Sequence, residues 1–430
     1  MRIKMKSTEK KQLDTKKNSG ITPFSGLNDP FQLNNGIELK NRLVKASMSE
    51  ELADRITREP TDDYIALYEQ WSKSGAAVLL TGNIMVDRRY TSEVRNVVLD
   101  EKSDAHIFRN LTKIAQQHGS QLWAQLNHPG RQMPMLNGWQ PLAPSDVAMK
   151  KGLRLVYKKP KIMTEKDISE VVDKFSKSAK LAQDYGFSGV QIHAAHGYLI
   201  NQFLSPASNK RQDQWGGSLE NRARILIEIF KAIRKEVGIG FPIAVKLNSA
   251  DYIQGGFNED DSIKIVQILE KEGIDLLEIS GGTYENPVMV DAKASTIKRE
   301  AYFMDYAEKV RNIVKTPIML TGGFESHAGM LQAIEEGATD FIGLARHFAL
   351  NPTVGHEILN NPTWQHKISK KTTGIAKIDH LMLINISWYE QQLKNIAQFN
   401  QADLNLSPWK SIYKTVTSMG LSAFIKLGRS

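Results

Sequence analysis

From residue 41 to about residue 350, short apolar runs alternate with longer stretches in which apolar residues recur every three or four positions. Continuous apolar runs of this length are typical of strands buried on both faces, as in a parallel sheet. Eight such runs occur, and a stretch with helical spacing follows each of them. The pattern predicts an α/β fold, a (β/α)8 TIM barrel, with strands at 41–47, 76–82, 120–126, 188–194, 242–248, 275–280, 317–323 and 340–345.

The stretch 164–182 shows the predicted helices most clearly. Thr164 and Asp167 form a capping-box signature at its start. Gly186 stands where a helix stop is expected. One helical face collects the apolar residues Ile168, Val171, Val172, Phe175, Ala179 and Ala182.

A doubly wound sheet is the alternative for alternating strands and helices. It would need a Gly-x-Gly-x-x-Gly turn after an early strand, and the sequence has none. The two longest connections, 127–163 and 195–219, each follow a predicted strand. In a barrel these loops lie at the carboxyl ends of the strands, where active sites are built.

The repeat divides the chain into three predicted segments. Residues 1–22 form a basic arm with no apolar run, residues 23–360 form the barrel, and residues 361–430 depart from the repeat. The run "HLMLINISWYEQQLKNIAQFN" predicts helix in this last segment. We expect a helical C-terminal extension packed on the barrel or on a partner subunit, the second of which would make a homo-oligomer. Its aromatic residues are interpreted as packing residues.

The formal net charge of +9 raises the question of nucleic-acid binding. Residues 1–17 carry a net charge of +5 and residues 361–430 carry +6, which leaves −2 for the segment between them. The basic charge therefore belongs to the two ends, and we expect no nucleic-acid partner.

No apolar run is long enough to span a membrane, and the first residues lack the apolar segment of a secretory signal. The absence of cysteine excludes disulfides, thiolate zinc sites, thiol catalysis and cysteine-bound iron–sulfur clusters. We therefore expect a cytoplasmic protein with no membrane association.

Glycines close the last two predicted strands, as a Gly-Gly pair in "LTGGF" (320–324) and as a single glycine in "IGLAR" (342–346). The loops after strands 7 and 8 are the usual phosphate site of such barrels, and glycine lets a phosphate approach the backbone N–H groups. Arg346 can add a charge-assisted contact. These glycines could also serve only as tight turns, but their occurrence in both final units favours a phosphate site.

The run "QIHAAHGY" (191–198) ends the fourth predicted strand with two histidines and a tyrosine. Two imidazoles could ligate a metal, but no nearby Asp or Glu completes a ligand set, so we expect none. Imidazole N–H groups are good donors to an oxygen that becomes anionic, and a tyrosine can donate a proton. His193, His196 and Tyr198 therefore indicate reduction of a double bond conjugated to a carbonyl. The hydride must come from a cofactor, because no side chain supplies one.

Several motifs together resemble the Old Yellow Enzyme family of FMN-dependent NADH:flavin oxidoreductases and ene-reductases. They are "LKNRLVKASMSE" (39–50), "AQLNHPGRQ" (124–132), "IHAAHGYLINQFLSPASNKRQDQWGGSLENR" (192–222), "KLNSADY" (246–252) and "GLARHF" (343–348). The resemblance covers roughly residues 24–360, and its block from 192 to 222 is highly specific. It implies tightly bound, non-covalent FMN, NADPH or NADH as reductant, and an enone-type small molecule as substrate.

The resemblance also implies roles for individual residues. His193 and His196 would bind the substrate carbonyl oxygen, and Tyr198 would protonate the α-carbon. Gln125 would hydrogen-bond the pyrimidine edge of the flavin, and Lys246 would lie by its N1/C2 carbonyl. The implied cofactor-binding set comprises Ser47, Met48, Ser49, Gly82, Gln125, Lys246, Gly322, Gly323, Gly343, Ala345 and Arg346.

Two positions depart from better-known members. Many have Thr or Cys in place of Ser49 and Arg in place of Lys246. The resemblance therefore does not predict how these two residues set the reduction potential of the flavin. With no cysteine and about 70 residues after the barrel, we expect neither the iron–sulfur cluster nor the second nucleotide-binding domain of some large relatives.

The substrate pocket is expected from loops 49–62, 127–163 and 281–300, where Trp139, Tyr252 and Tyr284 are candidate walls. Two other functions remain as alternatives: a flavin-free phosphosugar lyase or isomerase, and a flavin-binding protein without turnover.

Overall fold

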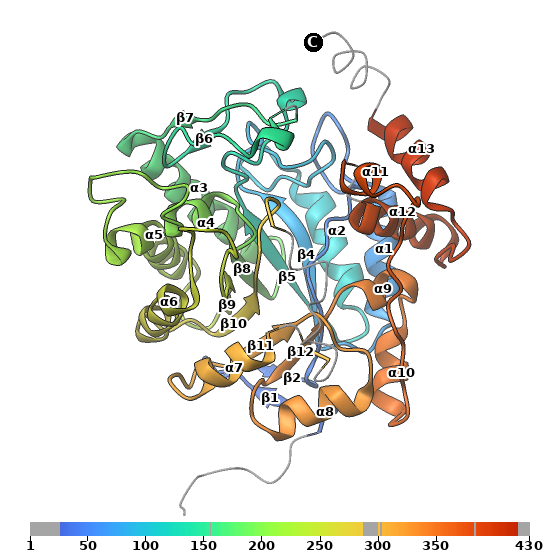
Figure 1. The fold of residues 1–430 in the computed structure, drawn as a ribbon. Coiled ribbons are helices and arrows are strands. Elements are labelled where there is room, and N and C mark those ends of the chain that lie inside the picture. Colours follow the sequence, from blue (N-terminus) through green and yellow to red (C-terminus); the bar gives the residue numbers. More distant parts are fainter. Residues whose placement is uncertain (1–25, 155, 287–299, 302, 382–383, 420–430) are drawn as a thin grey trace, which may run out of the picture.

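A computed structural model describes residues 26–154, 156–286, 300–301, 303–381 and 384–419. Its centre is a closed barrel of eight parallel strands in the order β10-β11-β12-β3-β4-β5-β8-β9 (Figure 1). All eight predicted strands are confirmed, and so is the predicted (β/α)8 barrel. The barrel strands are β3 (Leu43–Lys45), β4 (Val78–Met85), β5 (Gln121–Asn127), β8 (Gly189–Ala194), β9 (Ile243–Asn248), β10 (Leu276–Ser280), β11 (Ile318–Thr321) and β12 (Phe341–Leu344).

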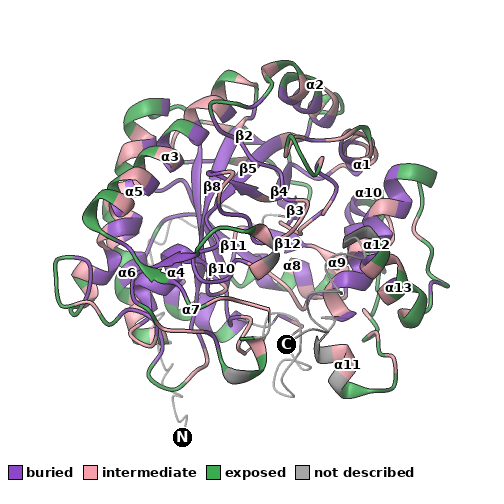
Figure 2. Cartoon of the chain, turned by 90° about the horizontal axis from the view of Figure 1, so that it is seen from above, coloured by how far each residue is buried: buried purple, intermediate pink, exposed green. Residues whose placement is uncertain are grey.

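Helices follow the strands and form a ring outside the barrel, with their buried faces turned inward (Figure 2). The ring consists of α1 (Asp62–Ser72), α2 (Ala105–Gln116), α3 (Glu165–Asp184), α5 (Leu219–Val237), α6 (Glu259–Glu272), α7 (Met304–Arg311), α8 (His327–Glu335), α9 (Arg346–Leu350) and α10 (Val354–Asn360).

Helix α3 begins as the sequence predicts. Thr164 is its N-cap, and the capping box with Asp167 is complete: Thr164 accepts the Asp167 N–H, and the Asp167 carboxylate accepts the Thr164 N–H. The reciprocal bonds satisfy two backbone donors that the first turn leaves open. The helix ends before Gly186, whose φ of +93° suits only glycine without strain.

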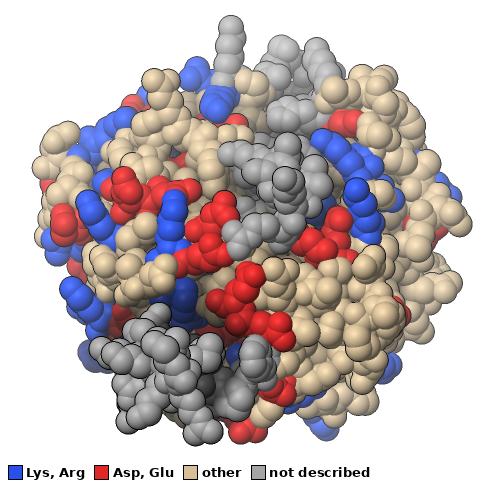
Figure 3. All heavy atoms as spheres, turned by 60° about the horizontal axis from the view of Figure 1, so that its bottom comes forward, with Lys and Arg blue, Asp and Glu red and all other residues tan. Residues whose placement is uncertain are grey.

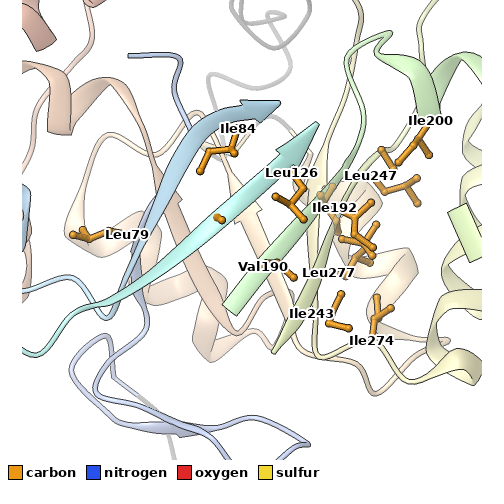
Figure 4. Close-up of a cluster of buried hydrophobic side chains, with 14 of the residues drawn as sticks. Leu79, Ile84, Leu126, Val190, Ile192, Ile200, Ile243, Leu247, Ile274 and Leu277 are labelled. Carbon is orange, nitrogen blue, oxygen red and sulfur yellow. The ribbon is translucent and has the colours of Figure 1, made fainter. Parts of the chain in front are cut away.

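Alternate residues of each barrel strand face opposite sides. One set packs against the ring helices; Figure 4 shows Val190 and Ile192 of β8 near Leu247 of β9 and Leu277 of β10. The other set fills the lower half of the barrel interior with a separate apolar cluster, capped by the hairpin of β1 (Phe31–Gln32) and β2 (Glu38–Leu39). The cluster consists of Leu33, Leu39, Val44, Ala77, Val78, Leu80, Trp123, Ala244, Leu276, Met319 and Phe341. The upper half of the interior is polar and carries the site described below.

The two long connections carry short elements at the carboxyl ends of the strands. Residues 127–163 contain η1 (Met135–Asn137), β6 (Leu142–Ala143), η2 (Lys151–Leu153) and β7 (Lys161–Ile162), and residues 195–219 contain α4 (Leu199–Leu204). Strands β6 and β7 pair with each other in parallel. Both connections therefore cover the functional end of the barrel.

The segment after the barrel contains α11 (Ala376–Leu381), α12 (Ile384–Phe399) and α13 (Pro408–Met419). Helix α12 contacts α1 and α9, so this extension packs on the barrel's own helix ring (Figure 1). Trp388 is fully buried there, and its indole N–H donates to the Leu406 carbonyl at 2.8 Å. This indole is a packing residue, as predicted.

The predicted arm 1–22 lies outside the described residues. On the face drawn in Figure 3, basic and acidic side chains are interspersed, with acidic ones near the centre. None of the described helices is long and apolar enough to cross a membrane.

Candidate active site

A cavity of about 740 Å³ opens at the carboxyl ends of the barrel strands. It brings together thirteen of the fourteen predicted site residues: Ser47, Met48, Ser49, Gln125, His193, His196, Tyr198, Lys246, Gly322, Gly323, Gly343, Ala345 and Arg346. Gly82 is not among the lining residues. Its N–H donates to the Glu50 carboxylate at 2.7 Å, and a Cβ there would lie 2.2 Å from the Met48 carbonyl oxygen. Gly82 therefore lies behind Met48, which lines the cavity.

The two histidines lie side by side, with ring centroids 5.1 Å apart. His193 is the second-last residue of β8, and its Nδ1 accepts the Ala195 N–H at 3.3 Å, which leaves the proton of a neutral ring on Nε2. His196 takes a left-handed φ of +60°, which places its Nε2 2.7 Å from the Ser280 hydroxyl. Such a conformation is uncommon outside glycine and is typical of constrained functional sites.

Burial lowers the pKa of both histidines well below the usual value, and the Lys246 ammonium adds to the effect. Both imidazoles are therefore neutral donors at neutral pH. Among the described residues, no group of three or more His, Asp or Glu side chains is arranged to hold a metal ion.

Tyr198 stands directly after the histidines, is 2 % exposed, and packs edge-on against His193. Its hydroxyl accepts the Asn83 amide N–H at 3.1 Å and lies 2.8 Å from the Tyr284 hydroxyl. Burial, followed by the Glu93 carboxylate, raises the Tyr198 pKa. The phenol therefore keeps its proton over the neutral range and can deliver it to a ligand atom in the cavity.

Ser49 has a partner that the sequence did not indicate. Its hydroxyl donates to the Glu93 carboxylate, which also accepts the Asn96 amide N–H at 2.7 Å. Burial raises the Glu93 pKa, although these two hydrogen bonds oppose the shift. The single hydroxyl proton of Ser49 is therefore committed to Glu93 when that carboxyl is ionised.

The cavity's other end is shaped for close approach to the backbone. Gly322 and Gly323 have φ values of +98° and +91°, a conformation that an L side chain rarely adopts. At Gly343 a Cβ would lie 2.1 Å from the Thr321 hydroxyl oxygen, so only glycine fits. Arg346, at the start of α9, lines the same end.

Part of the cavity wall comes from the extension beyond the barrel. Residues from Ile368 to Leu393 line it, among them Lys370 and Thr372 before α11 and Tyr389 and Glu390 on α12. Burial raises the pKa of Glu390 well above its usual value, and the nearby carboxylates of Glu51 and Glu93 act in the same direction. Helical spacing in the sequence could not show this wall, because spacing does not say which part of the barrel a later helix covers.

The comparison with known sequences decides the family. The sequence model of the NADH:flavin oxidoreductase / NADH oxidase family matches residues 26–372. The chain belongs to this family. It is 35% identical to the NADH-dependent flavin oxidoreductase iliE of Hypocrea jecorina, over 86% of this chain and 98% of that protein. It is 32% identical to the NADPH dehydrogenase of Geobacillus sp., over 80% of this chain and 95% of that protein.

Among solved structures, the old yellow enzyme homologue from Zymomonas mobilis superposes with a TM-score of 0.67 at 23% identity. The match covers 80% of this chain and 95% of that one, and it supports the barrel fold. The predicted Old Yellow Enzyme resemblance is thus confirmed. As a member of the NADH:flavin oxidoreductase family, the chain is an oxidoreductase with FMN as cofactor and NAD(P)H as reductant. The flavin-free and non-catalytic alternatives are not retained.

The residues of the cavity fit the FMN of this family. The Gln125 amide accepts from the Ser47 hydroxyl and donates to Gln191, each at 2.7 Å. One N–H and one lone pair remain for a ring edge that offers both an acceptor and a donor. At the glycine-lined end, the buried Thr321 hydroxyl oxygen has no hydrogen-bond partner within the described residues, as expected where a polar ligand group belongs.

Of the three candidate pocket aromatics, only Tyr284 lines the cavity. Trp139 is 54 % exposed, and the Tyr252 hydroxyl lies 3.2 Å from Ser249. Part of the third expected loop, residues 287–299, lies outside the described residues. The sequence argument missed Asn83, Glu93 and Ser280. Ser280 could have been found, because it is the last residue of a predicted strand at the functional end.

Proposed function

We propose that this oxidoreductase is an ene-reductase, which reduces the activated C=C bond of α,β-unsaturated carbonyl compounds. The observation that carries the proposal is the convergence of His193, His196 and Tyr198 at one wall of the cavity. Two neutral donors and one protonated phenol are the groups that addition of hydride and a proton across such a bond requires.

FMN, when bound, would supply the hydride at the expense of NAD(P)H. Around it, the proposed work of the chain is electrostatic and positional. His193 Nε2–H donates to the substrate carbonyl oxygen and polarises the alkene. For His196 to donate through Nδ1, the Ser280 hydroxyl must donate to its Nε2, which the 2.7 Å contact allows. Both donors are fixed before reaction, so no reorganisation opposes charge development on the oxygen.

Tyr198 is proposed to protonate the α-carbon. Asn83 donates to the phenol oxygen and therefore stabilises the phenolate that remains after transfer. The Tyr284 hydroxyl, 2.8 Å away, can donate in the same way or return a proton. We further propose that the cofactor end uses the glycines and Arg346 for the phosphate, and that the extension 361–430 closes the substrate side of the barrel domain 23–360.

Two anaerobic half-reactions test the function. Purified protein should show the absorption bands of oxidised flavin, and NAD(P)H should bleach them. Cyclohexenone should then restore these bands at a rate compatible with catalytic turnover. If NAD(P)H bleaches the flavin and a panel of enones, maleimides and nitroalkenes leaves it bleached, the ene-reductase proposal is wrong while the family assignment stands.

We expect Arg346→Ala to weaken FMN binding by about 1.5–3 kcal/mol, roughly 10- to 100-fold, because the phosphate loses a charged hydrogen-bond partner. Fluorescence titration of apoprotein with FMN measures this loss. Arg311→Ala is a matched control. Its guanidinium pairs with Asp340, which directly precedes β12, and neither residue lines the cavity. Unchanged FMN affinity in Arg346→Ala would remove this residue from the phosphate site.

The lowered pKa values of His193 and His196 predict the pH profile of phenol binding. We expect the logarithm of the affinity for 4-methylphenol to follow one straight line from about pH 5.5 to 7.5, around the ordinary histidine pKa of about 6.5. Neutral imidazoles gain no proton in this window, whereas the phenol itself titrates near 10. A bend near pH 6.5, with affinity favoured on the acid side, would indicate an imidazolium and contradict the assignment.

A further inference from the structure

A continuous chain of polar side chains crosses the upper barrel interior. The Ser47 hydroxyl donates to Gln125 Oε1 at 2.7 Å, and Gln125 Nε2 donates to Gln191 Oε1 at 2.7 Å. Gln191 Nε2 donates to Glu278 Oε2 at 2.7 Å, and Glu278 Oε1 lies 2.9 Å from the Lys246 ammonium. Glu278 and Gln191 are both 0 % exposed, so the chain lies beneath the cavity floor and reaches it only at its ends.

Strand register builds this chain. Gln125 pairs with Gln191 across β5 and β8, and Lys246 pairs with Glu278 across β9 and β10. Neighbouring residues in register on parallel strands turn their side chains to the same side. A carboxylate at this depth is costly unless it is paired and hydrogen-bonded, and Glu278 has one partner on each oxygen.

The carboxylate fixes the orientation of two amides. Because Glu278 only accepts, Gln191 must turn its NH2 group toward it and its oxygen toward Gln125. Gln125 must then donate to Gln191, which leaves its oxygen to Ser47. The hydrogen-bonding groups that Gln125 presents to the cavity are thus determined by the charge of Glu278, which is two hydrogen bonds away along the chain of side chains.

The same carboxylate offsets the positive charge of Lys246. The two groups are within ion-pair distance, but Glu278 Oε1 accepts no well-aligned hydrogen bond from any described residue. The ammonium can therefore still donate to a ligand in the cavity, which it lines. A ligand there meets a lysine N–H that belongs to a nearly neutral pair.

We propose that Glu278 is a positioning residue that lowers the reduction potential of bound FMN, by offsetting the charge of Lys246, and that sets the hydrogen-bonding edge of Gln125 through Gln191. The inference rests on the proposed placement of Lys246 and Gln125 at the flavin ring. Reduced flavin carries more negative charge than oxidised flavin, so an uncompensated cation nearby would favour the reduced form.

The test is the potential of Glu278→Gln, measured by dye equilibration at neutral pH. The Glu278 carboxylate would be separated from the flavin ring by the Lys246 side chain. At this separation, with an effective dielectric constant near 20, loss of its charge changes the ratio of the affinities for oxidised and reduced FMN by about 10- to 100-fold. We expect a rise of roughly 30–60 mV, since tenfold corresponds to 29.6 mV for two electrons. Asp275→Asn is the matched control: this buried carboxylate precedes the same strand, pairs with Arg234 at 2.6 Å, and does not line the cavity. It should leave the potential unchanged.

Gln191→Leu separates the two effects. It keeps the Lys246–Glu278 pair but releases the Gln125 amide, so FMN should bind about tenfold more weakly in both oxidation states, with no change of potential. Unchanged FMN affinity in this variant would overturn the orienting role.

Lys246→Met combined with Glu278→Met covers the case in which Glu278→Gln fails to fold, because replacing both members of a buried pair with apolar residues is well tolerated. The reduction potential of this double variant should lie within about 30 mV of the wild-type value, which corresponds to a tenfold ratio of affinities, because the pair was already nearly neutral. A fall of the reduction potential by about 60 mV or more would show that Lys246 acts as a full positive charge. It would overturn the proposal that Glu278 offsets this charge. If wild-type protein binds no FMN, the placement itself fails; if it binds FMN and reduces enones while Glu278→Gln keeps the wild-type potential, only this inference fails.

Discussion

Replacing both His193 and His196 with alanine is expected to slow reoxidation of the reduced flavin by enones on the order of 10³-fold or more. One oxyanion donor is typically worth about 10²–10³ in rate, and the double variant removes both donors from the substrate oxygen. The variant should also lose tight binding of phenols, with the long-wavelength charge-transfer band of the complex. Reduction by NAD(P)H should change little, because no oxyanion forms in that step.

Stopped-flow measurement of the two half-reactions checks this result. His196→Asn is the internal control, since an amide N–H can replace an imidazole N–H, and its effect should be mild. If the double variant binds phenols as tightly as the wild type with an unchanged band, the histidines do not hold the ligand oxygen. They would then be rim residues satisfied by contacts such as that of His196 with Ser280.

Tyr198→Phe is expected to slow enone reduction by about 10²–10⁴-fold, the usual contribution of a positioned general acid. Phenol affinity and flavin reduction by NAD(P)H should stay near the wild-type values, because neither requires a proton at the α-carbon. Tyr284→Phe is the matched comparison: it removes the neighbouring hydroxyl at 2.8 Å but leaves the Tyr198 phenol in place. Its effect should be much smaller. Equal losses in the two variants would mean that Tyr198 is not the proton donor.

The barrel was predictable because its signals are local. Each strand is a short apolar run, and the capping box of Thr164 and Asp167 involves residues only three positions apart. The proximity of His193, His196 and Tyr198 was predictable for the same reason, since the three residues lie within six positions of the sequence. Family resemblance then supplied the eleven cofactor-binding candidates, ten of which line the cavity.

The missed residues depend on contacts between distant parts of the chain. Ser49 and Glu93 are 44 positions apart, and Gln191 and Glu278 are 87 positions apart. Spacing within one strand cannot reveal which residue of another strand stands beside it, because register is a property of the closed sheet. Glu278 did leave a trace, as a charged residue between Leu277 and Ile279 in the run "DLLEIS". Only the paired strand shows that its partner is Lys246.

The extension wall has a consequence for how substrate range can change. The groups proposed to hold the cofactor and to carry the chemistry come from the barrel, whereas Tyr389 and Glu390 come from α12, a helix outside the eight-fold repeat. Selection or mutagenesis can therefore vary α12 without altering any strand register. A library confined to its cavity-facing positions should yield enzymes that share one redox centre and differ in the molecules they accept. In this protein, recognition and reactivity can diverge along separate stretches of sequence.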